Sequence, residues 1–232
     1  MTTPLRIVCI IQSRMSSQRL PGKALREVLG QPLLGYLIER MRRCTAIDDI
    51  ILATSIEPSD DQLASFAESI YVACYRGPLN DVASRMLGAA ESFKADALVR
   101  ISGDSPMMDS DLVDRLVTIF RANPELDLVT NVQQRTFPKG QSVEILSTAT
   151  LRRLIYKGLS PYEQEHVTTA LYRQPDSFNI VNVTNDQSQG EIQLSVDTEY
   201  DLDRFQVLLE ALGKPYWQHS IESVTSVASR LP

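Results

Sequence analysis

The first half of the chain alternates between short apolar runs typical of buried strands and longer segments with helical periodicity. The apolar runs include Leu5–Ile11, Asp49–Thr54 and Ala95–Ser102, and helical patterns separate them. Strands that are hydrophobic along their whole length are buried on both faces, as in parallel sheets whose connections are helices. The alternation therefore predicts an α/β fold with a mostly parallel, doubly wound sheet and helices on both faces.

The alternation stops after Leu126–Asn131. The stretch QQRTFPKGQSVEILS predicts an extended, hairpin-like structure, and TATLRRLIYKG and PYEQEHVTTALYRQ predict two helices. Strand-like Phe178–Val183 and Ile192–Asp197 follow, and then two C-terminal helical patterns. Because no linker composition separates these parts, we expect one domain over residues 1–232, with an insertion at about residues 133–176.

The predicted insertion is rich in apolar side chains for a surface segment, including Phe137, Leu151 and Leu171. Exposed apolar clusters require a cover, and a second copy related by a two-fold axis can supply one. The segment therefore predicts a homodimer contact and one wall of a substrate site. Tyr162 and His166 are one helical turn apart, so we expect them on one face of a helix.

The overall charge limits the partners of the chain. The formal net charge is −6, which argues against nucleic acids and anionic membranes because such partners usually need a basic surface. The three cysteines lack paired spacing and lie in or beside apolar segments, so we expect reduced thiols. The N-terminal apolar run is shorter than the roughly 20 residues of a membrane-spanning helix. These features predict a cytoplasmic protein.

A basic loop, QSRMSSQRLPGK, directly follows the first strand-like run. Ligands of open parallel sheets bind at the carboxyl ends of the strands, where this loop emerges. Arg14, Arg19 and Lys23, with backbone amides around Ser13, suit a polyphosphate through charge-assisted hydrogen bonds. The glycines of a P-loop and of a dinucleotide fingerprint are absent. A solvated surface loop is the alternative interpretation.

Two aspartates follow later strand-like runs. Asp104 comes after VRIS, where Gly103 permits a tight approach, and Asp197 ends IQLSV. Mg²⁺ typically takes one or two protein carboxylates together with water and phosphate oxygens, so both residues are candidate ligands. An aspartate before a helix is also a common N-cap, which is the alternative role for Asp197. We expect Asp109 and Asp111 to lie at the start of a helix.

Several motifs together resemble one known family, in order, over about residues 5–205: QSRMSSQRLPGK, VRISGDSP, FPKGQSVEILS, PYEQEHVT and SVDTEYDLDRF. It is the cytidylyltransferase family of the spore coat polysaccharide biosynthesis protein F type, which is similar to the synthetases of CMP-activated 2-keto-3-deoxy sugar acids. The resemblance implies a nucleotide-diphospho-sugar transferase-like Rossmann fold. It also implies a Mg²⁺-dependent reaction of CTP with a sugar acid or related sugar, giving a CMP-sugar and pyrophosphate for polysaccharide or glycoconjugate synthesis.

The resemblance assigns roles to individual residues. Arg14, Arg19 and Lys23 match the basic triphosphate loop of the family, and Asp104 and Asp197 match its metal-binding aspartates. Arg14 and Lys23 join the two aspartates as predicted catalytic residues. The complete set of predicted nucleotide-binding residues is Ser13, Arg14, Arg19, Lys23 and Gly103.

The PYEQEHVT motif marks His166 as a candidate contact to the acceptor sugar, with Glu144 and Glu165 as weaker candidates. Some positions depart from the family pattern, such as Ser16 in place of a usual glycine and Glu199 in place of a usual proline. These departures leave the nucleotide and the sugar open.

Two other functions fit the same pattern. A glycosyltransferase of this fold would use a nucleotide sugar as donor, but it would normally carry an Asp-x-Asp motif where Asp104 is followed by Ser105 and Pro106. A non-catalytic nucleotide-binding relative is the other possibility. The presence of Lys23, Asp104 and Asp197 together argues against that second alternative.

Overall fold

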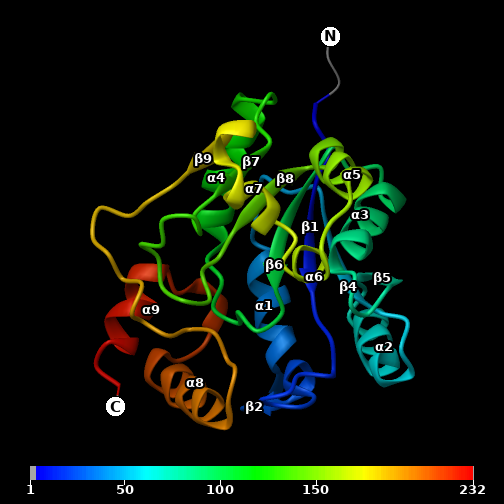
Figure 1. Cartoon of the computed structure of the whole chain (residues 1–232). Coiled ribbons are helices and arrows are strands. Elements are labelled where there is room, and N and C mark those ends of the chain that lie inside the picture. Colours follow the sequence, from blue (N-terminus) through cyan, green and yellow to red (C-terminus); the bar gives the residue numbers. More distant parts are fainter. Residues whose placement is uncertain (1–3, 232) are drawn as a thin grey trace.

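The computed structural model describes residues 4–231 (Figure 1). Within that range, seven strands form one sheet in the order β5-β4-β1-β6-β8-β7-β9. These strands are β1 (Ile7–Gln12), β4 (Asp49–Ser55), β5 (Ala73–Gly77), β6 (Ala97–Ser102), β7 (Leu128–Thr130), β8 (Glu144–Ser147) and β9 (Ile180–Asn182). A short hairpin next to the first loop pairs β2 (Glu27–Val28) with β3 (Gln31–Pro32).

Strand direction in the sheet is mostly parallel. β5, β4, β1 and β6 pair in parallel, as do β7 and β9, whereas β8 runs antiparallel to both β6 and β7. Because β8 is reversed, it begins near the edge at which the parallel strands end. Its first residue, Glu144, pairs in register with Arg100 of β6. The predicted α/β fold is confirmed.

Helices cover both faces of the sheet. Along β1, Ile7, Cys9 and Ile11 pack on one side and Val8 and Ile10 on the other, and all five are fully buried. The first side is covered by α1 (Leu33–Met41), α2 (Asp61–Ser69) and α4 (Ser110–Ala122). The second side is covered by α3 (Val82–Ser92), α5 (Thr148–Lys157), α6 (Pro161–Glu165) and α7 (Thr169–Arg173). This two-sided burial explains why the strands are hydrophobic along their whole length.

A third apolar cluster holds the C-terminal part, where α8 (Glu199–Leu212) packs beside α9 (Ile221–Ala228) (Figure 1). Tyr36 of α1 joins this cluster and contacts Phe205 edge to face. The cluster thereby fixes the start of α8 next to the first loop. No helix within residues 4–231 combines the length and apolar character that a bilayer-spanning helix needs.

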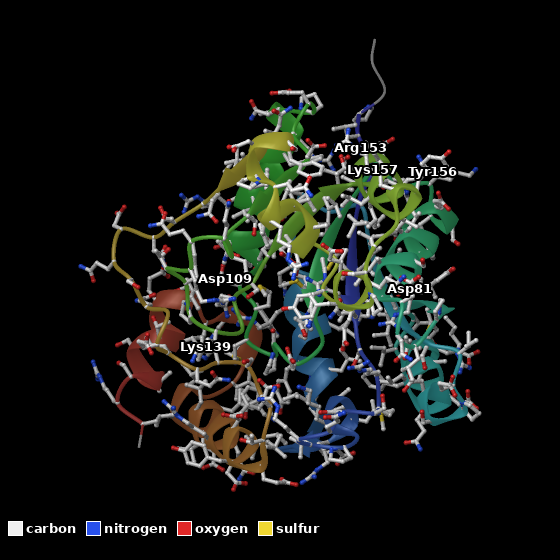
Figure 2. All side chains as sticks on the ribbon, in the orientation of Figure 1. Asp81, Asp109, Lys139, Arg153, Tyr156 and Lys157 are labelled. Carbon is white, nitrogen blue, oxygen red and sulfur yellow. The ribbon has the colours of Figure 1, made fainter. Side chains whose placement is uncertain are left out.

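Aspartates cap the first turns of α3 and α4. Asp81 accepts a hydrogen bond from the backbone N–H of Ser84, and Asp109 accepts one from that of Leu112, each at 2.9 Å. Both aspartates are labelled in Figure 2, and the helices that they cap, α3 and α4, cover opposite faces of the sheet. The predicted place of Asp109 at a helix start is confirmed, and Asp111 lies in the first turn of the same helix.

Two predicted elements were wrong. The segment at 192–197 is extended but forms only an isolated bridge between Gln193 and Lys139. The second helix of the predicted insertion is broken in two, and His166 lies at the break. The break lets Val167 enter the core and brings the hydroxyl of Thr168 onto Glu144. The rings of Tyr162 and His166 still lie together, with centroids 4.4 Å apart.

The segment at 133–176 is not a surface insertion, because it supplies β8 to the sheet and α5 to its cover. Most of its apolar side chains are buried in the core of the chain itself, namely Phe137, Val143, Ile145, Leu151, Leu154, Val167 and Leu171. The inference that these residues need a second subunit as cover was therefore wrong. A homodimer stays a prediction without that support.

Candidate active site

A cavity of about 630 Å³ opens at the carboxyl edge of the parallel strands. It lies between the loop after β1, the end of β6, and helices α3 and α6. The charged residues that line it are Arg14, Arg19, Lys23, Arg85, Arg100, Asp104, Glu165 and Asp197. Ser13, Gly103 and His166 line it as well. The basic loop therefore borders a large polar cavity, as the sequence predicted.

Lys23 is the central charge of one end of the cavity. Its Nζ donates to Asp104 Oδ2 and Asp197 Oδ1, each at 2.9 Å, and to the carbonyl oxygen of Val196 at 3.0 Å. Arg19 also contacts Asp197 Oδ1 at 2.9 Å, although its side chain is 67% exposed. Three distant parts of the sequence thus meet at one ammonium group.

The N-cap of α8 is Thr198, which excludes the capping role considered for Asp197. The Thr198 hydroxyl accepts from the N–H of Asp201, and the Asp201 carboxylate accepts from the N–H of Thr198 in a reciprocal capping box. The Asp197 carboxylate takes no part in this cap and faces Lys23. The capping interpretation of Asp197 was therefore wrong.

Two glycines shape the loop. Gly22 has φ +69°, a left-handed conformation that glycine adopts without strain, and its N–H donates to the carbonyl of Met15 at 2.9 Å. At Gly103, a Cβ would lie 2.9 Å from the Ser13 side chain and 3.0 Å from the Gln12 carbonyl. The absence of a side chain at Gly103 lets the end of β6 lie against the loop.

Asp60, which the sequence did not single out, anchors the same loop. Its buried carboxylate accepts from the N–H of Met15 at 2.7 Å and from the N–H and hydroxyl of Ser55. Burial alone would raise the pKa of Asp60, but these hydrogen bonds hold it below its ordinary value. The loop is thereby tied to the end of β4 through a charged group.

The other end of the cavity joins the loop to α6. Arg14 Nη2 contacts Glu165 Oε1 at 2.9 Å, and His166 lines the same wall. Two of the predicted acceptor residues, Glu165 and His166, are therefore placed at the cavity beside a predicted phosphate-binding residue.

Glu144 is placed differently, because it is buried and does not line the cavity. Its Oε2 accepts from Arg100 Nη1, and its Oε1 accepts from the hydroxyls of Thr168 and Tyr172, each at 2.6 Å. The expected direct contact of Glu144 with a substrate was wrong. Arg100 lies between Glu144 and the cavity, and the only sequence signal for it was a charge within an otherwise apolar strand.

The oxygen atoms around Lys23 suit a divalent cation. No group of three or more His, Cys, Asp or Glu side chains that could hold a metal occurs in the described part of the chain. The two carboxylates and the Val196 carbonyl nevertheless converge on the ammonium nitrogen, which stands in for a cation. Mg²⁺ needs only one or two carboxylates when substrate phosphates complete its coordination, so these residues fit it.

Comparisons with known proteins agree with this geometry. A cytidylyltransferase structure from Leptospira borgpetersenii serovar Hardjo-bovis matches with a TM-score of 0.93 and 28% identity, covering 97% of this chain and 94% of that chain. The spore coat polysaccharide biosynthesis protein SpsF of Bacillus subtilis is 27% identical over 216 residues, 90% of this chain and 88% of that protein. A 3-deoxy-manno-octulosonate cytidylyltransferase of Bdellovibrio bacteriovorus is 30% identical over 126 residues, 54% of this chain and 50% of that enzyme.

The sequence profile of one family covers nearly the whole fold. Residues 8–224 match the family described as cytidylyltransferase. This range contains the basic loop, both aspartates that contact Lys23, and all strands of the sheet after the first residue of β1. The chain belongs to the cytidylyltransferase family and is a nucleotidyltransferase enzyme.

Proposed function

We propose that this enzyme is a Mg²⁺-dependent cytidylyltransferase that transfers CMP from CTP to a hydroxyl group of a sugar acid or related sugar. The observation that carries the proposal is the convergence of Asp104 and Asp197 on Lys23, at the edge of the sheet where the basic loop emerges. The names of the similar proteins support a sugar-acid acceptor and a product for surface polysaccharide, with spore coat as one example.

The reaction is a displacement at phosphorus. The acceptor oxygen bonds to the α-phosphorus of CTP, the bond from that phosphorus to the bridging oxygen breaks, and pyrophosphate leaves with the bonding electrons while the hydroxyl proton passes to solvent. Such a step depends mainly on positioning and charge neutralisation. Arg14, Arg19 and Lys23 bind the triphosphate in this proposal, because cationic side chains form strong hydrogen bonds to phosphate oxygens.

Asp104 and Asp197 would hold the metal. Mg²⁺, when bound, supplies further neutralisation of phosphate charge during the transfer. Lys23 then turns from the carboxylates to the phosphates, which its flexible side chain permits. Gly103 contributes by keeping the end of β6 close to the loop, so that metal ligands and phosphate ligands share one site.

Glu165 and His166 form the acceptor wall of the cavity in this proposal. Both line it at the α6 end, opposite the Lys23 cluster along the loop. Glu144 acts from behind this wall by holding Arg100. These positions leave the central part of the cavity for the sugar.

We also propose a homodimer that works in the cytoplasm, where nucleoside triphosphates are made. The surface that we assign to the dimer is the outer side of α5, where Tyr156 is 92% exposed and lies beside Arg153 and Lys157 (Figure 2). Light scattering at micromolar concentration tests whether the chain forms a dimer. A monomer that is fully active would contradict it.

Binding of nucleoside triphosphates tests the function directly. With Mg²⁺ present, CTP is expected to raise the melting temperature more than ATP, GTP or UTP, because a ligand at about 100 times its Kd stabilises the folded state by about 2.7 kcal/mol. A larger shift with UTP or GTP would overturn the cytidylyl assignment. A response to UDP-sugars equal to that with CTP would favour the glycosyltransferase alternative.

A further inference from the structure

Arg100 is a charged residue on the cavity wall for which the proposed transfer chemistry gives no role. Arg100 and Ser102 are two positions apart on the same side of β6, and both line the cavity. Asp104 follows two residues after Ser102 and lines it as well. Because side chains two positions apart share one face of a strand, Arg100 lies roughly 7 Å behind Ser102 on the wall that leads to Asp104. It is therefore placed to contact a molecule that reaches the transfer centre from the α6 end.

The guanidinium group of Arg100 is held in a fixed orientation. Its Nε donates to Gln12 Oε1 at 3.0 Å, and its Nη1 donates to Glu144 Oε2 at 2.6 Å. Glu144 is in turn fixed by the hydroxyls of Thr168 and Tyr172. Nη2 of Arg100 donates to no acceptor within residues 4–231, and the side chain is 17% exposed. The clamp thus leaves one donor group of the guanidinium for a ligand in the cavity.

This end of the cavity carries more positive than negative charge. Arg14 and Arg100 are each paired with one carboxylate, from Glu165 and Glu144. Arg85 is 2% exposed and donates through Nη1 to the carbonyls of the loop before α3, while its buried Nε has no partner among the described residues.

The neighbouring acids do not cancel this excess. Burial and the nearby charge of Arg14 lower the pKa of Arg85, against the attraction of Asp60 and Asp81. Both of those carboxylates are already engaged, Asp60 with the loop and β4 and Asp81 with Ser84. Three guanidinium groups therefore face two paired carboxylates at the cavity, an arrangement that favours an anionic ligand.

We propose that Arg100 is a specificity-determining residue that binds the anionic group of the acceptor, a carboxylate or a phosphate. This inference rests on the proposed function and narrows the acceptor to acidic sugars. Glu144, and the hydroxyls of Thr168 and Tyr172 that fix it, belong to the segment that also carries Glu165 and His166, whereas the Lys23 cluster serves the triphosphate. A neutral sugar would leave the remaining donor group of Arg100 without a partner, which disfavours its binding.

Titration with inorganic sulfate tests the subsite without a known acceptor. Sulfate is expected to bind the protein that is already saturated with CTP and Mg²⁺, and Arg100→Met should weaken this binding about tenfold or more. Arg152→Met is the matched control, because Arg152 pairs with Glu91 on the exposed surface, and it should bind sulfate like the wild type. Failure of sulfate to bind, or equal binding by Arg100→Met, overturns the proposal.

Competition identifies the source of the anion. If CTP abolishes sulfate binding, the subsite belongs to the phosphates of the nucleotide and the proposal fails, while the proposed function stands. If CTP itself does not bind, the proposed function fails, and sulfate binding is then measured on the free protein. Arg100→Met could fail to fold because it leaves Glu144 buried without its partner. In that case the double variant Arg100→Met, Glu144→Gln, which removes both charges, takes its place in the sulfate titration.

Kinetics gives a second readout. With a sugar acid and its methyl ester as acceptors, the wild type should prefer the acid, and Arg100→Met should lose most of this preference through a higher KM for the acid. Arg100→Lys should restore part of the preference, because it keeps the charge but not the planar fork. The KM for CTP should stay unchanged in both variants. An unchanged preference in Arg100→Met contradicts the role of Arg100.

Discussion

The ammonium nitrogen of Lys23 lies 2.9 Å from a carboxylate oxygen of Asp104, although the two residues are 81 positions apart in the chain. Asp197 contacts the same nitrogen at the same distance. The point at which the proposed metal ligands converge is thus held by a side chain of the protein. Lys23 and a divalent cation are therefore expected to compete for the same oxygen atoms.

Removal of the Lys23 charge should strengthen the binding of metal in the absence of nucleotide. Lys23→Met is expected to bind Mn²⁺ about tenfold more tightly than the wild type, equivalent to about 1.4 kcal/mol, as measured by the electron paramagnetic resonance signal of free Mn²⁺. Lys157→Met, on the outer side of α5, serves as the control (Figure 2). Equal affinities of the wild type and Lys23→Met for Mn²⁺ would show that Lys23 does not compete.

Asp197 and Thr198 are adjacent, but their substitution should have opposite effects. Asp197→Asn is expected to abolish metal-dependent pyrophosphate release while changing the free energy of unfolding by less than about 1 kcal/mol, because its ion pairs are partly solvated. Thr198→Ala should cost about 1 kcal/mol of stability through loss of the N-cap and keep its activity per folded molecule. Asp104→Asn should behave like Asp197→Asn. The idea fails if Asp197→Asn retains its turnover.

Asp60 should make stability depend on pH in the acid range. Its pKa is lowered in the folded protein from an ordinary value of about 3.9. Ionised Asp60 therefore contributes stability that is fully present above about pH 4 and is lost as pH falls through the folded pKa. Asp60→Asn replaces an accepting oxygen with an NH₂ group facing N–H donors, so it should cost about 2 kcal/mol at neutral pH.

Urea denaturation of the wild type and of Asp60→Asn between pH 3 and pH 7 measures this effect. The difference in unfolding free energy between the two proteins should shrink as pH falls below about 4. A difference that is constant over the whole range would contradict the linkage.

A methyl group at position 103 should disturb the loop. Gly103→Ala places a Cβ 2.9 Å from the Ser13 side chain and 3.0 Å from a backbone oxygen, and the expected cost is about 1–3 kcal/mol with weaker CTP binding. Gly190→Ala is the control, because the nearest atom to its Cβ would be 3.5 Å away. Chemical denaturation and CTP titration are the measurements. Equal stability and CTP affinity in the two variants would show that the loop adapts without cost.

Local sequence patterns predicted the α/β sheet, the helices that cover it, and the basic loop and Asp104 at the cavity. Lys23 and Asp104 could be predicted to lie close together because the loops that follow the parallel strands β1 and β6 leave the sheet at one edge. Asp197 follows no strand of the sheet, because residues 192–197 form only an isolated bridge, and its assignment rested on the family resemblance. Asp60 could not be distinguished from Asp61 at a helix start, since its role depends on a contact with Met15 in a distant loop.

The contacts of Arg100 could not be predicted from local sequence patterns, because they too are long-range. They depend on the reversed direction of β8 and on the register that places Glu144 opposite Arg100. The break of the helix at His166 could not be predicted either, because Val167 and Leu171 are spaced as in a continuous helix. The hydrogen bond from Thr168 to Glu144 competes with that helix and is a long-range contact.

The partners that hold Arg100 on the far side from β1 come from one uninterrupted stretch between Glu144 and Tyr172. Lys23, Asp104 and Asp197, in contrast, come from three separate regions of the gene. A single recombination segment could therefore exchange the acceptor wall between relatives and leave the nucleotide half unchanged. Ile145 and Leu146 of that stretch are buried in the sheet. Such chimaeras should therefore tolerate new polar residues at the wall only if β8 keeps apolar side chains at these two positions.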